Sequence, residues 1–340
     1  MLKLTQLDYI PDELLSVSPR ELYRVLPGPT LVHLEGRQPQ PLFLCVLQHG
    51  NEHTGFYALQ KVLKKYRNTE LPRSLSIFFG NIEAARRNLR RLDEQVDYNR
   101  VWPGHQYGDC EESRIMQQVT DIMRERKVFV SLDIHNNTGL NPHYACINRL
   151  DPKFIYLANL FSRTIVYFTR PLGVQSMAFA ELCPAVTVEC GKAGQPYGEP
   201  HAIEYIEACL RMAELPTHDL REREFNIYST VAIVRFSKDI DFSFSNDSAD
   251  ILLDSDLDYL NFRELEPGTR LGQFKDDAFK GVEVWNNDGD NVVQEFFQFK
   301  DNEIRLLKPV MPSMLTSDEH IIRQDCLCYL MEKHDLPELQ

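Results

Sequence analysis

Between residues 41 and 215 the chain alternates short, continuous apolar runs with longer segments whose apolar residues recur at helical spacing. The first run, PLFLCVLQ (41–48), is typical of a strand that is buried on both faces. Further strands are expected at 74–80, 128–134, 164–168 and 185–190, and helices at 56–66, 111–126 and 199–213. This alternation predicts an α/β fold with a mixed, largely parallel sheet flanked by helices.

The pattern changes near residue 225. Short strand-like runs follow one another, and turn signals such as NDSAD and NNDGDN separate them. The runs are expected at 228–236, 249–253, 281–285 and 292–299. They predict a smaller C-terminal all-β domain. The polar stretch PTHDLRERE (216–224) is the expected junction, so the predicted domains are 1–220 and 221–340.

Composition excludes several classes of partner and location. Lys and Arg number 37 against 50 Asp and Glu, a net charge of −13, which argues against nucleic acid or an anionic membrane as the main partner. No apolar run approaches the length of about 18 residues that a membrane span needs, and the N-terminus does not resemble a signal peptide. Most of the eight cysteines lie in or beside apolar segments and none forms a C-x-x-C pair, so a reducing cytoplasm is expected.

Chemically versatile residues stand at the ends of several expected strands. His49 and Glu52 follow the first strand, His135 ends the strand at 128–134, and Glu189 closes the strand at 185–190. Each residue alone has an ordinary structural explanation. The carboxyl ends of parallel strands share one edge of a sheet, however, so together these side chains predict one site. Two His residues and a Glu suit Zn²⁺, and a second Glu beside them is the arrangement of metal-assisted hydrolysis.

A second interpretation of the first segment stays open. HGNEH (49–53) matches H-x-x-E-H, a pattern in which both His residues bind zinc and the Glu is the base. That pattern needs a helix, whereas this segment follows a strand and contains Gly50. His49 and Glu52 are therefore favoured as ligands, with His53 outside the metal shell.

Asn99 and Arg100 form the candidate substrate-binding pair. A guanidinium binds a carboxylate through two parallel hydrogen bonds, so an adjacent Asn and Arg suit a carboxylate clamp. The basic run RRNLRR (86–91) lies upstream, and its alternative explanation is a solvated helix face.

Four segments together resemble the succinylglutamate desuccinylase/aspartoacylase family of the zinc carboxypeptidase clan. They are LCVLQHGNEHTG (44–55), NIEAARRNLRRLDEQVDYNRVWPG (81–104), SLDIHNNTG (131–139) and TVECGKAG (187–194). The stretch YLNFRELEPGTRLG (259–272) also resembles the family's C-terminal β domain. The resemblance implies a zinc carboxypeptidase-like catalytic domain.

Position by position, the resemblance also assigns roles. It implies that His49, Glu52 and His135 bind zinc and that Glu189 is the general base and acid. Asp97 would accept a hydrogen bond from His49 and orient its ring. The resemblance also implies that Asn99 and Arg100 hold a substrate carboxylate, while Arg90 polarises the scissile carbonyl. Arg91 is the alternative to Arg90, because the spacing to Asn99 is longer than the family's common form.

One position departs from the family pattern. Aspartoacylases carry a further substrate-binding Arg ten residues before the catalytic Glu, where this chain has Phe179. If Phe179 replaces that guanidinium in the pocket, N-acetylaspartate should be a poor substrate, unless Arg163 or Arg170 reaches the pocket instead. The tyrosine that aspartoacylases bring from the C-terminal domain has no evident counterpart in the sequence.

The predicted function is zinc-dependent hydrolysis, with one Zn²⁺ per chain, of the amide bond of a small N-acyl amino acid or related carboxylate-bearing amide. The alternatives are a metallocarboxypeptidase acting on short peptides and a non-catalytic metal- or carboxylate-binding protein. A structural zinc fits less well, because a fourth protein ligand is not evident. The oligomeric state, a homo-oligomer included, stays open.

Overall fold

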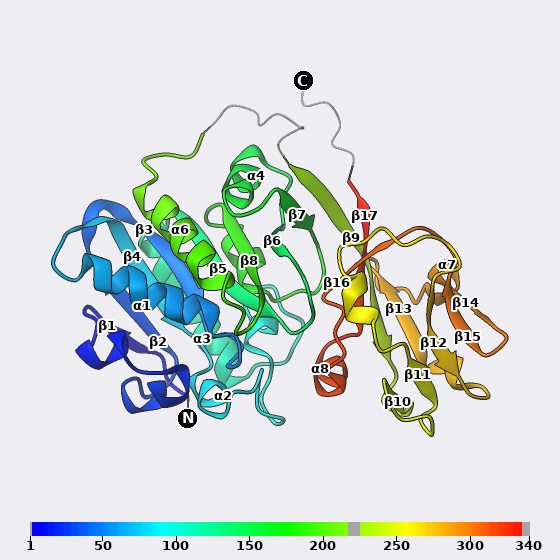
Figure 1. Ribbon diagram of the computed structural model, residues 1–340. Helices are drawn as coiled ribbons and strands as arrows, with labels where there is room; N and C mark the ends of the chain where they lie inside the picture. Colours follow the sequence, from blue (N-terminus) through cyan, green and yellow to red (C-terminus); the bar gives the residue numbers. More distant parts are fainter. Residues whose placement is uncertain (1, 217–224, 335–340) are drawn as a thin grey trace.

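The computed structural model describes residues 2–216 and 225–334 (Figure 1). Within these ranges, twelve strands form one sheet in the order β1-β2-β4-β3-β5-β8-β6-β7-β9-β17-β16, with β13 paired to β9. The strands of this sheet are β1 (Thr5–Leu7), β2 (Thr30–Leu34), β3 (Gly36–Val46), β4 (Leu71–Phe79), β5 (Val130–Asn137), β6 (His143–Ile147), β7 (Thr164–Tyr167), β8 (Ala185–Lys192), β9 (Asn226–Phe236), β13 (Val282–Asn286), β16 (Met311–Ser313) and β17 (Cys328–Lys333).

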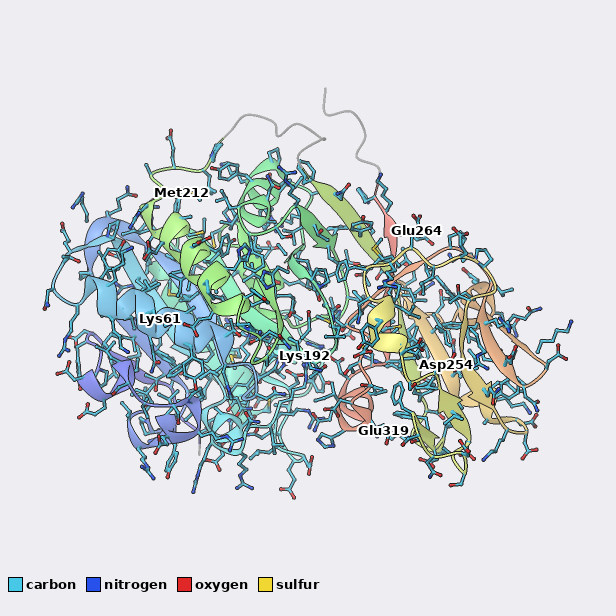
Figure 2. The ribbon with its side chains drawn as sticks, viewed as in Figure 1. Lys61, Lys192, Met212, Asp254, Glu264 and Glu319 are labelled. Carbon is cyan, nitrogen blue, oxygen red and sulfur yellow. The ribbon has the colours of Figure 1, made fainter. Side chains whose placement is uncertain are left out.

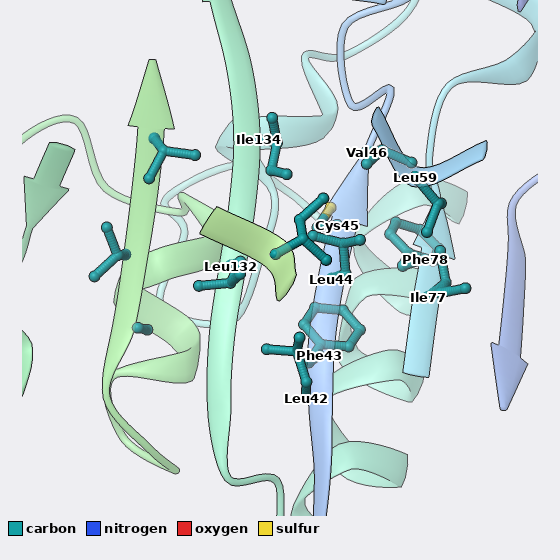
Figure 3. Packing of buried hydrophobic residues seen from close by; sticks show 14 of the residues in the cluster. Leu42, Phe43, Leu44, Cys45, Val46, Leu59, Ile77, Phe78, Leu132 and Ile134 are labelled. Atoms are coloured by element: carbon teal, nitrogen blue, oxygen red, sulfur yellow. The ribbon is translucent and has the colours of Figure 1, made fainter. Parts of the chain in front are cut away.

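The centre of this sheet is parallel. Strand β3 runs parallel to β4 and β5, and β5 runs parallel to β8. Leu42 to Val46 of β3 are fully buried, and Figure 3 shows these side chains packed among those of β4 and β5. A continuous apolar run folds into such a strand because both of its faces are covered. The mixed, largely parallel α/β sheet predicted from the sequence is confirmed.

Helices cover the sheet. In Figure 1, α1 and α6 lie side by side on one face, and α3 lies behind the sheet. Both α1 and α3 turn an apolar stripe inward, because their buried residues recur at helical spacing. The helices are α1 (Thr54–Tyr66), α2 (Ile82–Arg87), α3 (Glu111–Glu125), α4 (Pro152–Asn159), α5 (Gln175–Phe179), α6 (Gly198–Arg211), α7 (Val293–Phe296) and α8 (Glu319–Gln324).

The C-terminal part contains the second, smaller sheet that the sequence predicted. Its order is β10-β11-β12-β15-β14, and it has an apolar core of its own. Its strands are β10 (Phe242–Ser243), β11 (Ile251–Leu253), β12 (Arg270–Phe274), β14 (Phe297–Lys300) and β15 (Glu303–Leu306).

The large sheet also extends into the C-terminal part. Strand β9 pairs in parallel with β7 and antiparallel with β17 and β13, so sheet hydrogen bonds cross from the α/β part into the C-terminal part. The domain division at 220/221 stays a prediction. Apart from Pro216, its expected junction lies outside the described residues.

One expected strand is partly wrong. The run at 292–299 begins as the short helix α7, and only its end continues as β14. Sequence patterns also gave no indication of β2, β6 or several short helices. Among the described residues, no helix is long and apolar enough to cross a membrane. All eight cysteines are free.

Candidate metal centre and active-site cleft

The strand-end residues predicted from the sequence meet at one edge of the sheet. His49 and Glu52 lie in the turn between β3 and α1, His135 lies on β5, and Glu189 lies on β8. These three strands are parallel neighbours, so their carboxyl ends coincide.

His49, Glu52 and His135 converge on one point. One potential ligand atom from each lies within 4.8 Å of the others, and all three side chains are buried. The two carboxylate oxygens of Glu52 lie 2.8 Å from Nδ1 of His49 and 2.7 Å from Nδ1 of His135. Glu52 thus bridges the two imidazoles, and both rings turn the same nitrogen toward the centre.

A carboxylate fixes each ring from the opposite side. Nε2 of His49 lies 3.0 Å from Asp97, and Nε2 of His135 lies 2.9 Å from Asp133. Such contacts set the tautomer that leaves Nδ1 free to bind a metal. Burial opposes a charge on His135, but Asp133 and Glu52 outweigh it and hold the pKa of its imidazole well above the usual value.

Asp133 was not assigned a role from the sequence. It is fully buried. The side-chain amide of Gln48 donates to both of its oxygens, at 2.8 and 2.7 Å. Gln48 in turn accepts a hydrogen bond from the Trp102 indole at 2.6 Å. This network holds the His135 ring rigidly.

Glu189 is buried beside the three-residue cluster, with the cleft in front of it. Asn137 donates to its carboxylate at 2.8 Å and also contacts the hydroxyl of Tyr144 at 3.3 Å. Burial raises the pKa of Glu189 to about 7; the attraction of His135 opposes this shift, and the repulsion of Glu52 adds to it. A carboxyl group with a pKa near neutrality can both accept and return a proton.

Gly50 allows the turn that carries His49 and Glu52 to pack against the segment that carries Arg90. A Cβ at this position would lie 2.1 Å from the backbone nitrogen of Ala85 on α2, so only glycine fits. The Gly50 N–H donates to the carbonyl oxygen of Arg90 at 3.1 Å. The segment that carries Arg90 is therefore fixed against the segment that carries His49 and Glu52.

Arg90, and not Arg91, faces the cluster. Its Nη1 lies 3.6 Å from Glu52 and its Nη2 lies 3.1 Å from Asp97. Arg91 instead donates to the backbone carbonyls of Leu92, Asp93 and Gln95.

Arg90 and Arg100 meet at one carboxylate from the C-terminal part. The same oxygen of Asp325 lies 3.1 Å from Arg90 and 2.9 Å from Arg100. Burial opposes the charge on Asp325, but these two cations hold its pKa below the usual value, so it is ionised. No local pattern pointed to Asp325, because its partners lie more than 200 residues earlier in the chain.

Asn99 contacts His135 and the backbone of Gln175. Its side-chain oxygen accepts from the backbone N–H of Gln175 at 2.8 Å, and its Nδ2 lies 3.2 Å from Nε2 of His135. Asn99 also lines the cleft, as Arg100 does.

His53 does not join the cluster. It directly precedes α1, and its Nε2 lies 2.8 Å from the carbonyl oxygen of Gly50. The HGNEH segment is thus a turn and not the helix that the alternative zinc pattern needs.

A cleft lies in front of the cluster, and His49, Glu52, His135 and Glu189 all line it. Much of its lining is apolar and combines residues of both parts of the chain. The apolar residues, called the apolar wall below, include Cys146, Val166, Phe168, Val174, Ile321 and Cys326.

A sequence profile of the succinylglutamate desuccinylase/aspartoacylase catalytic domain matches residues 40–213, just over half of the chain. The chain belongs to this family. The resemblance seen in the four sequence segments is thereby confirmed. No curated protein matches the sequence.

Several solved structures share the fold. The succinylglutamate desuccinylase of Chromobacterium violaceum is 17% identical, with a TM-score of 0.56 over 89% of this chain and 87% of that one. Murine aminoacylase 3 is 14% identical, with a TM-score of 0.57 over 88% and 96%. The ectoine utilization protein EutE (DoeB) of Ruegeria pomeroyi is 13% identical, with a TM-score of 0.51 over 90% and 88%.

Phe179 does not line the cleft, although the family comparison placed a substrate-binding arginine at this position. It is fully buried and stacks on Phe43, with ring centroids 4.3 Å apart. The expectation that its phenyl ring replaces a guanidinium inside the pocket is therefore wrong. Of the two arginines considered as substitutes, Arg170 lines the cleft.

The structure offers a candidate for the C-terminal tyrosine that had no evident counterpart in the sequence. Tyr329 of β17 lines the cleft and is buried. β17 reaches this position because it pairs with β9, which continues the large sheet.

Proposed function

We propose that this chain is a zinc-dependent hydrolase that cleaves the amide bond of a small N-acyl amino acid or a related amide. The observation that carries the proposal is the convergence of His49, Glu52 and His135 with Glu189 at one cleft. The family supports a hydrolytic deacylase, and a cytoplasmic location stays a prediction.

The donor set supports zinc. Two imidazole nitrogens and one carboxylate form the three-ligand set of catalytic zinc sites. The buried Glu52 carboxylate lies between two Nδ1 atoms whose rings are fixed by Asp97 and Asp133. A bound Zn²⁺ would make water more acidic and polarise the substrate carbonyl.

Glu189 is proposed to move the proton. Its carboxylate takes a proton from the attacking water and returns it to the leaving amine, which its pKa of about 7 suits. Arg90 is proposed to stabilise the negative charge that develops on the carbonyl oxygen, because its guanidinium reaches the cluster from the side of Glu52.

Asn99 and Arg100 are proposed to orient the polar end of the substrate. Both line the cleft, and Asn99 is held in place by the backbone of Gln175. The apolar wall formed by residues such as Val166 and Phe168 is suited to an uncharged arm of the substrate.

The test is zinc content followed by a substrate panel of N-acetyl, N-succinyl and N-formyl amino acids together with short peptides. We expect one zinc per chain and zinc-dependent release of amine from at least one acyl amino acid. Cleavage of the peptides alone would support the metallocarboxypeptidase alternative. Ligand binding without turnover would support a non-catalytic binding protein.

A further inference from the structure

The cationic groups beside the metal centre already hold a carboxylate of the protein itself. Asp325 lies 3.1 Å from Arg90 and 2.9 Å from Arg100, and these three side chains are 12–13% exposed. All three line the same cleft as His49 and Glu52. Asp325 thus stands where a substrate carboxylate would stand if Arg100 were its clamp.

The backbone fixes Asp325 in this place. The residue directly follows α8, and its N–H donates to the carbonyl oxygen of Ile321 at 2.9 Å. Two residues later, the N–H of Leu327 donates to Val234 of β9 at 2.8 Å, and β17 begins. Asp325 therefore lies in a short, hydrogen-bonded connection between α8 and β17 and not on a long loop.

Carboxylates of the protein already outnumber the two guanidiniums. Arg90 also contacts Glu52 and Asp97, so three carboxylates surround two guanidiniums. A substrate carboxylate at Arg100 must either lie beside Asp325 or displace it. The first arrangement places like charges together, and the second leaves a buried carboxylate unpaired, so both are unfavourable. A neutral polar group meets neither penalty.

Arg170 lines the same cleft and is not paired with a carboxylate of the described residues. It follows β7 and lies close to the apolar wall, and its Nε donates to the carbonyl oxygen of Asn287 at 3.3 Å. Among the described residues, no carboxylate lies within 4 Å of Arg170. A second cavity adjoins the cleft, and Arg100, Arg170 and Asp325 line both.

We propose that Asp325 determines substrate specificity: its carboxylate withdraws Arg90 and Arg100 from carboxylate recognition, and Arg170 binds the substrate carboxylate instead. This inference rests on the proposed function and names its substrate class. The substrate carries a neutral group at Arg100 and a single carboxylate toward Arg170.

The experiment measures binding, so it does not depend on turnover. N-acetylleucine and N-acetylleucinamide differ only in a carboxylate and a carboxamide. Both are titrated by calorimetry into zinc-loaded Glu189→Gln protein, with and without Asp325→Asn. We expect Asp325→Asn to tighten binding of the acid by about tenfold or more and to change binding of the amide by less than about threefold. Parallel changes for the two ligands, or an unchanged acid affinity, would overturn the role of Asp325.

The matched control for Asp325→Asn is Asp254→Asn. Asp254 also pairs with an arginine, Arg270, at 2.6 Å, and Figure 2 shows it beside the second sheet. It does not line the cleft. We expect it to leave both affinities unchanged.

Arg170→Gln tests whether Arg170 binds the substrate carboxylate. This variant still tests the proposal if Asp325→Asn fails to fold. We expect Arg170→Gln to weaken binding of the acid by about tenfold or more and to spare the amide. The control is Arg149→Gln, since Arg149 is an exposed arginine that pairs with Glu181. Full acid affinity in Arg170→Gln would overturn the role of Arg170. If the acid binds as expected and wild-type protein cleaves no amide, the proposed function fails and the specificity inference stands.

Discussion

His135 and Glu189 are register partners on the parallel strands β5 and β8. One belongs to the proposed metal ligands and the other is the proposed base. Their proximity therefore follows from strand pairing in the sheet and not from the conformation of a loop. Changes at either residue should have separable effects on metal binding and on turnover.

His135→Ala should lose zinc. The change removes one of three proposed ligands and leaves Asp133 and Glu52 without their shared partner. Metal analysis of the purified variant checks this, with the exposed His320→Ala as control. Full zinc occupancy in His135→Ala would remove His135 from the ligand set.

Glu189→Gln should keep zinc and lose turnover. The amide is nearly isosteric with the carboxylate but cannot accept the proton, so kcat should fall by about 10²–10⁴-fold. Steady-state kinetics and metal analysis are measured on the same preparation, with the exposed Glu181→Gln as control. Wild-type kcat in Glu189→Gln would show that the base lies elsewhere, and Glu52 would be examined next.

The pH dependence of kcat/KM should show an acidic limb that belongs to Glu189. The base acts only when it is ionised, so activity should rise as pH increases through its pKa. Burial raises the pKa of Glu189 from the usual 4.5 to about 7, and a bound dication lowers it again. The midpoint of the limb should therefore lie below about 7. A rate that stays constant from pH 4 to 8 would contradict this role.

Asp97→Asn should weaken zinc binding about 10- to 100-fold without abolishing it, because the carboxylate that fixes the His49 ring is lost. Competition with a chelator of known affinity measures the effect. The matched variant is Asp109→Asn, since Asp109 pairs with Arg114 on the surface. Equal zinc affinity in both variants would leave Asp97 without a part in holding the metal.

Phe179→Ala should destabilise the protein by about 3–5 kcal/mol, because it removes a fully buried ring that stacks on Phe43. Denaturant unfolding measures the loss. The exposed Tyr197→Ala should have little effect. A small loss in Phe179→Ala would indicate that Phe179 does not belong to the core.

The residues of the candidate metal centre could be anticipated because each stands at the end of an apolar run, and parallel strands bring such ends together. His49, His135 and Glu189 follow this rule. Asp325 and Tyr329 do not, since they enter the cleft through pairing between β9 and β17, which joins segments about 100 residues apart. Phe179 shows the reverse error: a position inferred from a family spacing lies on a helix that faces the core.

The continuation of the large sheet from β7 into β9 means that the catalytic half is not self-sufficient. A chain ending at residue 216 would leave β7 with a row of open backbone donors and acceptors, a template for aggregation. The same truncation would remove Asp325, which pairs with Arg90 and Arg100, and Tyr329, which lines the cleft. Such a shortened protein would keep Glu52 and Asp97 beside Arg90 but leave Arg100 without a carboxylate partner, so we expect it to bind anions that the full chain would reject.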